Sequence, residues 1–291
     1  MTFQKITNFF RDIFQTSFSI VKIIILSKWF VSFGKHRTEE RVCSILGNGP
    51  CLTQDIEKHF DFIASKKKFC VNLFALSNEY ELIKPEYYVL AAPEFWLAKT
   101  TDYLINERYK LSDSFVSKTT WPMKLFIPFA AKGSELCKKV ITNKNIELVY
   151  YNNTPVEGMS GIINLLFKAN LGMPRPHNVL IPTIYLAMNI GFKKIIILGA
   201  DHSWHEGIKV DGSNKPTVNH EHFYDKREVR MPMYKLDGMQ YFIHDIFCKL
   251  HYAFKGYFIL SSYADYMKVD ILNASSKSYI DAFKKTSDLN S

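Results

Sequence analysis

The sequence is poor in cysteine, with 5 among 291 residues, and no two of them form a C-x-x-C pair. An odd number of scattered cysteines argues against a disulfide framework and against a zinc site, and it suits a reducing compartment. The sequence also has no arginine-rich tract, no RNA-binding signature and no zinc-finger spacing. The 37 Lys and Arg residues exceed the 28 Asp and Glu residues, but the two signs are interspersed. Nucleic acid is therefore not the expected partner.

Long apolar runs are missing as well. The first 33 residues are rich in apolar and aromatic side chains, yet their longest stretch without a charge is Ile13 to Val21. That stretch is far shorter than the roughly 20 predominantly apolar residues that a membrane-spanning helix needs. No small-residue cleavage site follows it, so a secretory signal peptide is not expected.

Basic residues gather in the same segment, where acidic residues are few: Lys5, Arg11, Lys22, Lys28, Lys35 and Arg37. A helix with apolar rings and flanking lysines is typical of attachment to an anionic membrane surface. We therefore expect residues 3–33 to form a helix that lies on the membrane. Two alternatives are a spanning helix and an ordinary helix packed on the domain or on a partner.

The rest of the chain alternates between short apolar runs and helical patterns. Strands are expected at 42–46, 68–71, 86–91, 124–127, 146–151, 193–198 and 269–273. Helices are expected from 55 onward and at 96–109, 178–190, 236–267 (with a break at Gly256) and 279–285. Residues 152–173 are expected to be irregular, and residues 202–235 to form a long loop or lid. The apolar run after Gly191 is typical of a central parallel strand, which is buried on both faces.

These patterns predict an α/β fold built on one Rossmann-like, doubly wound and mostly parallel sheet. Residues 1–37 are expected to be the membrane-associated helix and a basic linker, and residues 38–291 one catalytic domain. In such folds, ligands bind beyond the carboxyl ends of the strands. Four segments fall there: 47–52, Asn72, 91–94 and 199–205.

The turn Gly47-Asn48-Gly49-Pro50 follows the first strand directly. Its backbone N–H groups and the next helix N-terminus can approach a phosphate. The turn matches neither the dinucleotide-binding nor the P-loop pattern. A plain tight turn between strand and helix is the alternative explanation.

Three segments, GNGPCL, VNLF and HNVLIPTIYLAMNIGFKKIIILGAD, carry a resemblance to a known family, and VDILNASSKSYIDAF extends it to the C-terminal part. The chain resembles the bacterial sialyltransferases of glycosyltransferase family 42 and related domains of surface-polysaccharide gene clusters. The resemblance covers roughly residues 41–285 and implies a variant of the GT-A fold with a lid. It departs from the family at Cys51, which replaces a serine, and at the lid, where the family's tyrosine pair is not evident.

The resemblance implies a donor site and a reaction. Asn72 would hydrogen-bond the nucleotide, Asn178 would contact the donor, and Asp201 matches the acid that closes a G-x-D turn beginning at Gly199. The residues that would line the cytidine monophosphate part of the donor are Gly47, Asn48, Gly49 and Pro50.

A transferase of this type needs a general base and charge stabilisation for the departing phosphate. Histidine suits the first task because its usual pKa lies near the working pH. His220 and His222 lie on the expected lid, and Tyr224 can donate to a phosphate; His202 and His205 are the competing pair beside Asp201. The cations available on the same segment are Arg227, Arg230 and Lys235.

The function expected from this resemblance is an inverting, metal-independent glycosyltransferase. It would move a sugar, sialic acid or a relative, from a CMP-linked or other nucleotide-linked donor to a saccharide or lipid-linked glycan acceptor. It would act peripherally at the cytoplasmic face of a bacterial inner membrane, in surface-polysaccharide synthesis, with no resident cofactor or metal. A homo-oligomer is left open.

Three alternatives stay open. One is a metal site built from His202, His205, His220, His222 and Asp201. Another is a Mg²⁺-dependent pyrophosphoryl transferase that resembles pterin diphosphokinases, with Asp201, the adjacent His and Glu206 holding the metal. The last is a membrane-docked scaffold that retains only the fold.

Overall fold

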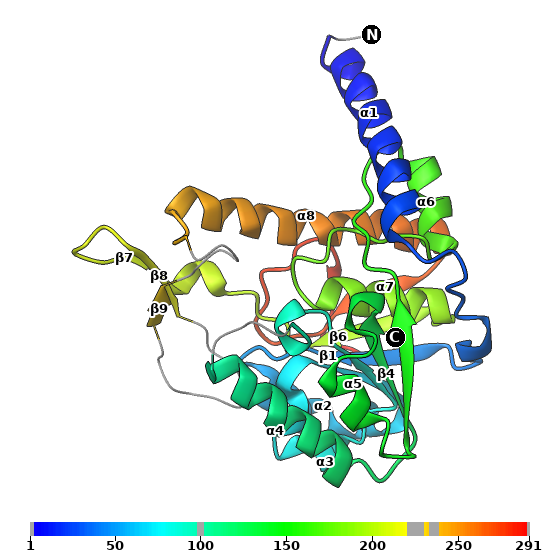
Figure 1. Cartoon of the computed structure of the whole chain (residues 1–291), viewed down its shortest axis with the longest axis vertical. Coiled ribbons are helices and arrows are strands. Elements are labelled where there is room, and N and C mark those ends of the chain that lie inside the picture. The colour runs from blue at the N-terminus through cyan, green and yellow to red at the C-terminus, as the bar shows by residue number, and fades with distance from the viewer. Residues whose placement is uncertain (1–2, 98–101, 220–229, 233–238, 290–291) are drawn as a thin grey trace.

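The computed structural model describes residues 3–97, 102–219, 230–232 and 239–289 (Figure 1). An eight-stranded sheet forms its centre, and every pair of neighbouring strands in it runs parallel. In spatial order the strands are β11 (Lys284–Lys285), β10 (Asp270–Asn273), β6 (Lys194–Leu198), β1 (Val42–Leu46), β2 (Lys67–Val71), β3 (Tyr87–Val89), β4 (Met123–Pro128) and β5 (Ile146–Tyr151). This confirms the predicted α/β fold with a mostly parallel sheet.

The strand order places a topological switch between β1 and β6. From β1 the chain adds β2, β3, β4 and β5 in one direction, and it then returns to the other side of β1 with β6 and β10. The connections that leave β1 and β6 therefore diverge to opposite faces of the sheet. The space above their carboxyl ends is where open α/β sheets bind ligands.

Helices cover both faces of the sheet because the side chains of each strand alternate between two apolar clusters. In β6, Ile195 and Ile197 belong to one cluster, and Ile196 and Leu198 to the other. The first cluster also includes residues of α1 (Phe3–Leu26), α6 (Ser160–Lys168), α7 (Leu180–Ile190) and α8 (Ile243–Met267). The second includes residues of α2 (Leu52–Ser65), α3 (Glu79–Ile83), α4 (Asp102–Lys118) and α5 (Glu135–Val140).

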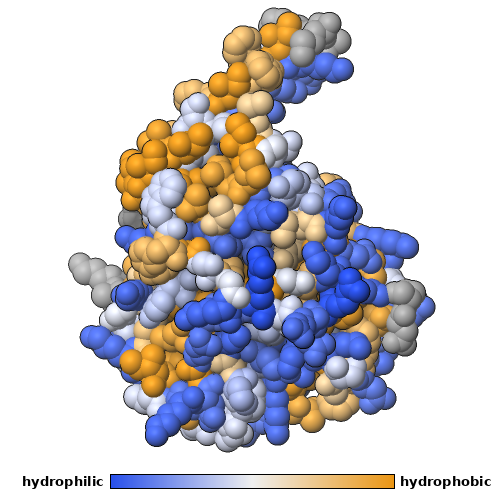
Figure 2. Space-filling model, turned by 90° about the vertical axis from the view of Figure 1, so that its right-hand side faces the viewer, coloured by the Kyte–Doolittle hydropathy of each residue, from blue (hydrophilic) through white to orange (hydrophobic). Residues whose placement is uncertain are grey.

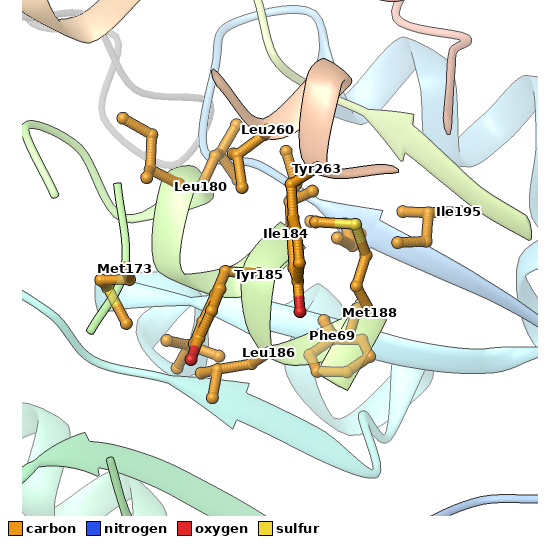
Figure 3. Close-up of a cluster of buried hydrophobic side chains, with 14 of the residues drawn as sticks. Phe69, Met173, Leu180, Ile184, Tyr185, Leu186, Met188, Ile195, Leu260 and Tyr263 are labelled. Atoms are coloured by element: carbon orange, nitrogen blue, oxygen red, sulfur yellow. The ribbon is translucent and has the colours of Figure 1, made fainter. Parts of the chain in front are cut away.

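Helix α7 is the most deeply buried helix of the described part and lies between the sheet and α8. Its Leu180, Ile184 and Met188 point toward neighbouring apolar side chains, including Leu260 of α8 and Ile195 of β6 (Figure 3). The helix ends at Ile190, and Gly191 follows with a φ of 121°. This segment agrees with the predicted helix, Gly stop and buried strand.

Two expectations for the second half of the chain are wrong. Residues 152–173 contain α6, whose buried Ile163 and Phe167 lie four residues apart on one helical face. No helix forms at 279–285; the chain there is irregular up to β11. Hydrogen bonds from Tyr279 N to Asp201 O (2.9 Å) and from Ser278 Oγ to Ala200 O (2.6 Å) hold that segment against the turn after β6.

Two other helices differ in extent from the prediction. The helix expected at 96–109 begins at Asp102 and continues to Lys118, because Leu111 and Phe115 bury its second half in the core. The helix expected at 236–267 begins at Ile243 and passes Gly256 without a break. Gly256 is required there by packing, since a Cβ atom would lie 2.5 Å from Cδ1 of Ile181.

The predicted lid includes a small three-stranded antiparallel sheet of β7 (Ile208–Val210), β8 (Pro216–Asn219) and β9 (Arg230–Pro232). Residues 220–229 and 233–235 of the lid lie outside the described residues. Among the described helices, none is both long enough and apolar enough to cross a membrane.

Candidate functional site

The carboxyl ends of β1 and β6 are joined directly by their backbones. Gly47 N donates to Leu198 O at 2.8 Å, and Gly49 N donates to Gly199 O at 2.9 Å. A Cβ atom on Gly47 would lie 2.3 Å from Gly199 O, and one on Gly49 would lie 2.0 Å from Oδ2 of Asp201. The two glycines of the turn are therefore required by the close approach of the two strand ends.

Asp201 lies at the N-terminus of α2. Its two carboxylate oxygens accept from Cys51 N at 3.3 and 3.2 Å. Burial raises the pKa of Asp201, and the hydrogen bonds from Cys51 oppose that shift. A helix N-terminus favours an anion, and here the protein itself supplies one. A phosphate bound at this turn would face the Asp201 carboxyl group.

A second carboxylate, Asp55 of α2, accepts hydrogen bonds from the turns after β6 and β10. The sequence did not predict this role. Asp55 Oδ2 accepts from Gly199 N at 2.8 Å, and its Oδ1 accepts from Ser276 N at 3.0 Å. Ser275 Oγ, in the turn after β10, accepts from Ala200 N at 3.0 Å. The only available signal was the position of Asp55 in the first turn of a helix, where acidic residues are common.

Asn72 follows β2 on the other side of the GNGP turn. Asn48 Nδ2 donates to Val71 O at 3.1 Å, which places the two predicted nucleotide-contacting residues next to each other. Asn72 has a left-handed backbone with a φ of 48°, and its carbonyl accepts from the Tyr88 hydroxyl at 2.7 Å. Its Oδ1 is buried and has no hydrogen-bond partner among the described residues.

A chain of three polar side chains follows β6. His202 Nε2 lies 2.5 Å from the hydroxyl oxygen of Tyr257, which lies 2.9 Å from Asn178 Oδ1. Asn178 Oδ1 also accepts from the backbone N–H groups of Leu180 and Ile181, so it can only be an acceptor. The Tyr257 proton must then point to Asn178, and His202 must donate its Nε2 proton to Tyr257. The geometry thus fixes the tautomer of His202.

His202 is therefore a poor candidate for the base. Burial lowers its pKa to about 3, so the ring is neutral and weakly basic at physiological pH. Its backbone has a φ of 53°, which is strained for a residue other than glycine. The Trp204 ring packs beside the imidazole with centroids 4.2 Å apart. This histidine acts as a fixed, neutral hydrogen-bond donor that holds Tyr257 and, through it, Asn178.

Asn178 keeps one unused group. Its Oδ1 is fully engaged, whereas its Nδ2 is buried without a hydrogen-bond partner among the described residues. Buried polar atoms without a partner are rare in folded proteins, and each calls for an explanation such as a ligand. Asn178 Nδ2 can donate and Asn72 Oδ1 can accept, which are the two roles that recognition of a nucleobase amide edge requires.

Glu206 lies beyond His202 in an exposed cluster with Lys277 and Tyr279. Its carboxylate accepts from Lys277 Nζ at 2.7 Å and from the Tyr279 hydroxyl, and these bonds lower the pKa of Glu206. The ring of His205 packs edge-on against Tyr279 with centroids 4.3 Å apart. Within the part of the chain that the structure describes, no three His, Cys, Asp or Glu side chains converge to hold a metal ion.

Several predicted site residues lie outside the described residues: His220, His222, Tyr224, Arg227 and Lys235. The backbone of Arg230 is part of β9. The structure brings together Gly47, Asn48, Gly49, Asn72 and Asp201 through the contacts above, with Pro50 and Gly199 in the same two turns. Tyr257 and Asp55 are the members that the sequence did not reveal.

Similarity to known proteins is limited to solved structures. No protein-family model matches the chain, and no curated protein matches it either. Among solved structures, the chain is similar to the MAf glycosyltransferase from Magnetospirillum magneticum AMB-1, with a TM-score of 0.47 and 13% sequence identity. The match covers 90% of this chain and 35% of that one, so the chain spans about a third of that protein.

Proposed function

We propose that the chain is a glycosyltransferase that binds a nucleotide-sugar donor above the carboxyl ends of β1 and β6. The observation that carries this proposal concerns two buried amide atoms that have no hydrogen-bond partner among the described residues: Asn178 Nδ2, just before α7, and Asn72 Oδ1, just after β2. A cytosine ring presents both an amino donor and carbonyl or ring-nitrogen acceptors, so it matches both atoms. A CMP-linked donor, as in sialyl transfer, is therefore the donor that we propose.

The position of Asp201 implies that different residues bind the phosphate and the nucleoside of the donor. Because this carboxylate occupies the N-terminus of α2, the donor phosphate has to be neutralised elsewhere. The candidate cations are those predicted on the lid, Arg227, Arg230 and Lys235, which can stabilise the charge that develops on the leaving phosphate. The GNGP turn and Asn72 then serve the nucleoside end of the donor.

The base in this proposal belongs to the lid. Because His202 is buried and neutral, we assign the removal of the proton from the acceptor hydroxyl to His222, with His220 two residues before it. The hydroxyl oxygen then forms a bond to the anomeric carbon as the bond to the phosphate oxygen breaks, with inversion. The nucleotide monophosphate departs with its electron pair, and no metal takes part.

A lipid-linked glycan acceptor, made at the membrane for a surface polysaccharide, fits the surroundings of Asn178. His177 stacks on Tyr252 with centroids 5.2 Å apart, and the Arg175 guanidinium lies over the same ring at 5.5 Å. Arg175 also pairs with Glu157 at 3.8 Å, beside the residues that hold α1. An acceptor anchored near α1 would thus reach the site along this aromatic and basic surface.

The test is donor turnover by the full chain in the presence of a chelator. The expected result is release of CMP from CMP-linked sialic acid or a relative, accelerated by a glycan acceptor. The Asn178→Asp variant keeps the three hydrogen bonds to Oδ1 and replaces only the Nδ2 donor, so it should raise KM for the donor by about tenfold or more while its unfolding midpoint stays near that of the wild type. If Asn178→Asp turns over the donor with unchanged KM, the assigned site is wrong.

A further inference from the structure

The orientation of α1 on the body is the reverse of that of an ordinary surface helix. Its buried residues are Thr16, Ser19 and Ile23, and Ser27 continues the same face just after the helix. Apart from Ile23, these side chains are small and polar. Surface helices normally bury their apolar side, but here the polar side contacts the protein.

Specific hydrogen bonds hold this polar side in place. Ser19 Oγ donates to Glu157 O at 2.8 Å, and Lys22 Nζ donates to Pro155 O at 2.6 Å. Ser27 Oγ lies 2.8 Å from Thr154 Oγ1, and the pair is buried. Gly158 is needed for this contact, since its Cβ atom would lie 2.1 Å from Thr16 Oγ1. The outward direction of the apolar side is thus fixed by the packing of α1.

The outward side carries a broad apolar surface, which we call the α1 apolar face. It comprises exposed large side chains of α1 and of the residues just after it: Ile6, Phe9, Phe10, Ile13, Phe14, Phe18, Ile20, Val21, Ile24, Ile25, Leu26, Trp29 and Phe30. Phe14 is 73% exposed and Ile25 is 72% exposed. Exposed apolar residues of α6, Ile162 and Leu165, add to it, and hydrophobic side chains gather over α1 and α6 in Figure 2. Contiguous apolar surfaces of this kind mark an interaction site.

The charges around this face identify its occupant. Residues 1–38 contain six Lys or Arg residues and one acid, Asp12. Lys5, Arg11 and Lys28 are exposed. In a symmetric dimer formed through this face, two surfaces with the same excess of positive charge would be brought together, which is unfavourable. Anionic lipid headgroups would neutralise them while the acyl chains received the rings.

We propose that the α1 apolar face docks the protein on a bilayer that contains anionic lipid, with the polar side of the helix bound to the body. This inference does not depend on the proposed transferase activity. It assigns the segment of residues 3–30 to the membrane surface, with Trp29 at the level of the headgroups, where indole rings are favoured.

The experiment is co-sedimentation of the full chain with vesicles of phosphatidylcholine that contain roughly one-third phosphatidylglycerol. The double variant Phe14→Ser/Ile25→Ser should lose binding by tenfold or more. The control Leu82→Ser/Ile141→Ser removes two exposed apolar side chains, 59% and 60% exposed, from α3 and from the residue after α5, and it should bind like the wild type. Replacing Lys5 and Lys28 by Gln should weaken binding by about fivefold each.

A second readout locates the contact directly. Lipids brominated on their acyl chains should quench the fluorescence of the wild type, and Trp29→Phe should abolish most of that quenching while binding persists. The proposal is overturned if the full chain stays in the supernatant, or if Phe14→Ser/Ile25→Ser binds as the wild type does. It is also overturned if the wild type is an oligomer that ignores vesicles and becomes a monomer in that variant, since a second copy would then cover the face.

Discussion

Tyr257 accepts the Nε2 proton of His202 at 2.5 Å, and the two side chains come from α8 and from the turn after β6. Because the Tyr257 hydroxyl donates its own hydrogen bond to Asn178 Oδ1 at 2.9 Å, the direction of both bonds is fixed. These two hydrogen bonds connect the turn after β6, through Tyr257 of α8, to the start of α7. It gives His202 a positioning role in a site whose base we assign to another histidine.

The substitution Tyr257→Phe tests this relay. It leaves the buried Nε2 proton of His202 without an acceptor, which should lower the free energy of unfolding by about 1–3 kcal/mol. Donor turnover should fall as well, because Asn178 loses the one side-chain hydrogen bond to its Oδ1 and keeps only those from the backbone of Leu180 and Ile181. The matched control is Tyr263→Phe on the same helix, which removes a buried hydroxyl bonded to Asn189 at 2.6 Å. The control should be destabilised by about 1 kcal/mol with turnover retained. Equal loss of turnover in both variants would contradict the relay.

The depressed pKa of His202 predicts a dependence of stability on pH. The pKa is about 3 in the folded state and near 6.5 in the unfolded state, so the unfolded chain takes up a proton first as the pH falls. The contribution is fully present above pH 6.5 and is lost progressively toward pH 3. Between pH 7 and pH 5 it should amount to about 2 kcal/mol of unfolding free energy. His177, whose pKa burial lowers to about 4, acts in the same direction.

Urea unfolding of the wild type and of His202→Gln at pH 7 and pH 5 measures this contribution. The variant should lose clearly less stability than the wild type over that interval. The raised pKa of Asp201 acts in the opposite direction, and it is common to both proteins. His251→Gln, at an exposed position on α8, serves as the control for the histidine-to-glutamine substitution itself. Identical pH dependence in wild type and His202→Gln would show that His202 does not titrate as assigned.

The substitution Gly49→Ala tests the close approach of the two turns. The new methyl group would lie 2.0 Å from Asp201 Oδ2 and 2.8 Å from Gly199 O, so one of the turns has to move. Overpacking of this kind costs about 1–3 kcal/mol, and we expect donor binding to weaken too. Gly161→Ala is the control, because nothing lies within 4 Å of that position in α6. A lower thermal unfolding midpoint for Gly161→Ala than for Gly49→Ala would refute this explanation of the turn.

The substitution His222→Ala tests the predicted base. Turnover should fall by about 10²–10⁴-fold while donor affinity is retained, because a general base acts on the acceptor hydroxyl rather than on the nucleotide. His220→Ala gives the comparison within the same segment. Steady-state kinetics with a saturating acceptor separates kcat from KM. Full activity of His222→Ala would move the base to another residue, and His205 would be the next to test.

The sequence predicted most of the sheet because buried parallel strands leave a strong signal. Runs such as Ile195 to Leu198 are apolar at every position, and a Gly precedes or follows them. The C-terminal helix was predicted wrongly because tertiary hydrogen bonds override local preference. Ser278 and Tyr279 bond to the turn after β6, and no local pattern shows partners nearly 80 positions away.

The same limit applies to the candidate site. Gly47, Asn72 and Asp201 were identifiable because each directly follows a strand. Tyr257 was not, since it lies within a long helical pattern where an aromatic residue is usually part of the core. The N-terminal segment was predicted to be a helix with an apolar face, but only the structure shows that its polar side contacts the body.

The central claim is that the residues at the carboxyl ends of β1 and β6 bind the nucleotide of a CMP-linked donor without a metal. The most direct measurement is the thermal stability of the full chain with CMP, CDP, UDP, GDP and ATP, each with and without Mg²⁺. A nucleotide at 100 times its Kd adds about 2.7 kcal/mol of stability. The account predicts that CMP stabilises the protein in the presence of a chelator. Stabilisation by ATP or a diphosphate only when Mg²⁺ is present would contradict it and favour a metal-dependent pyrophosphoryl transferase.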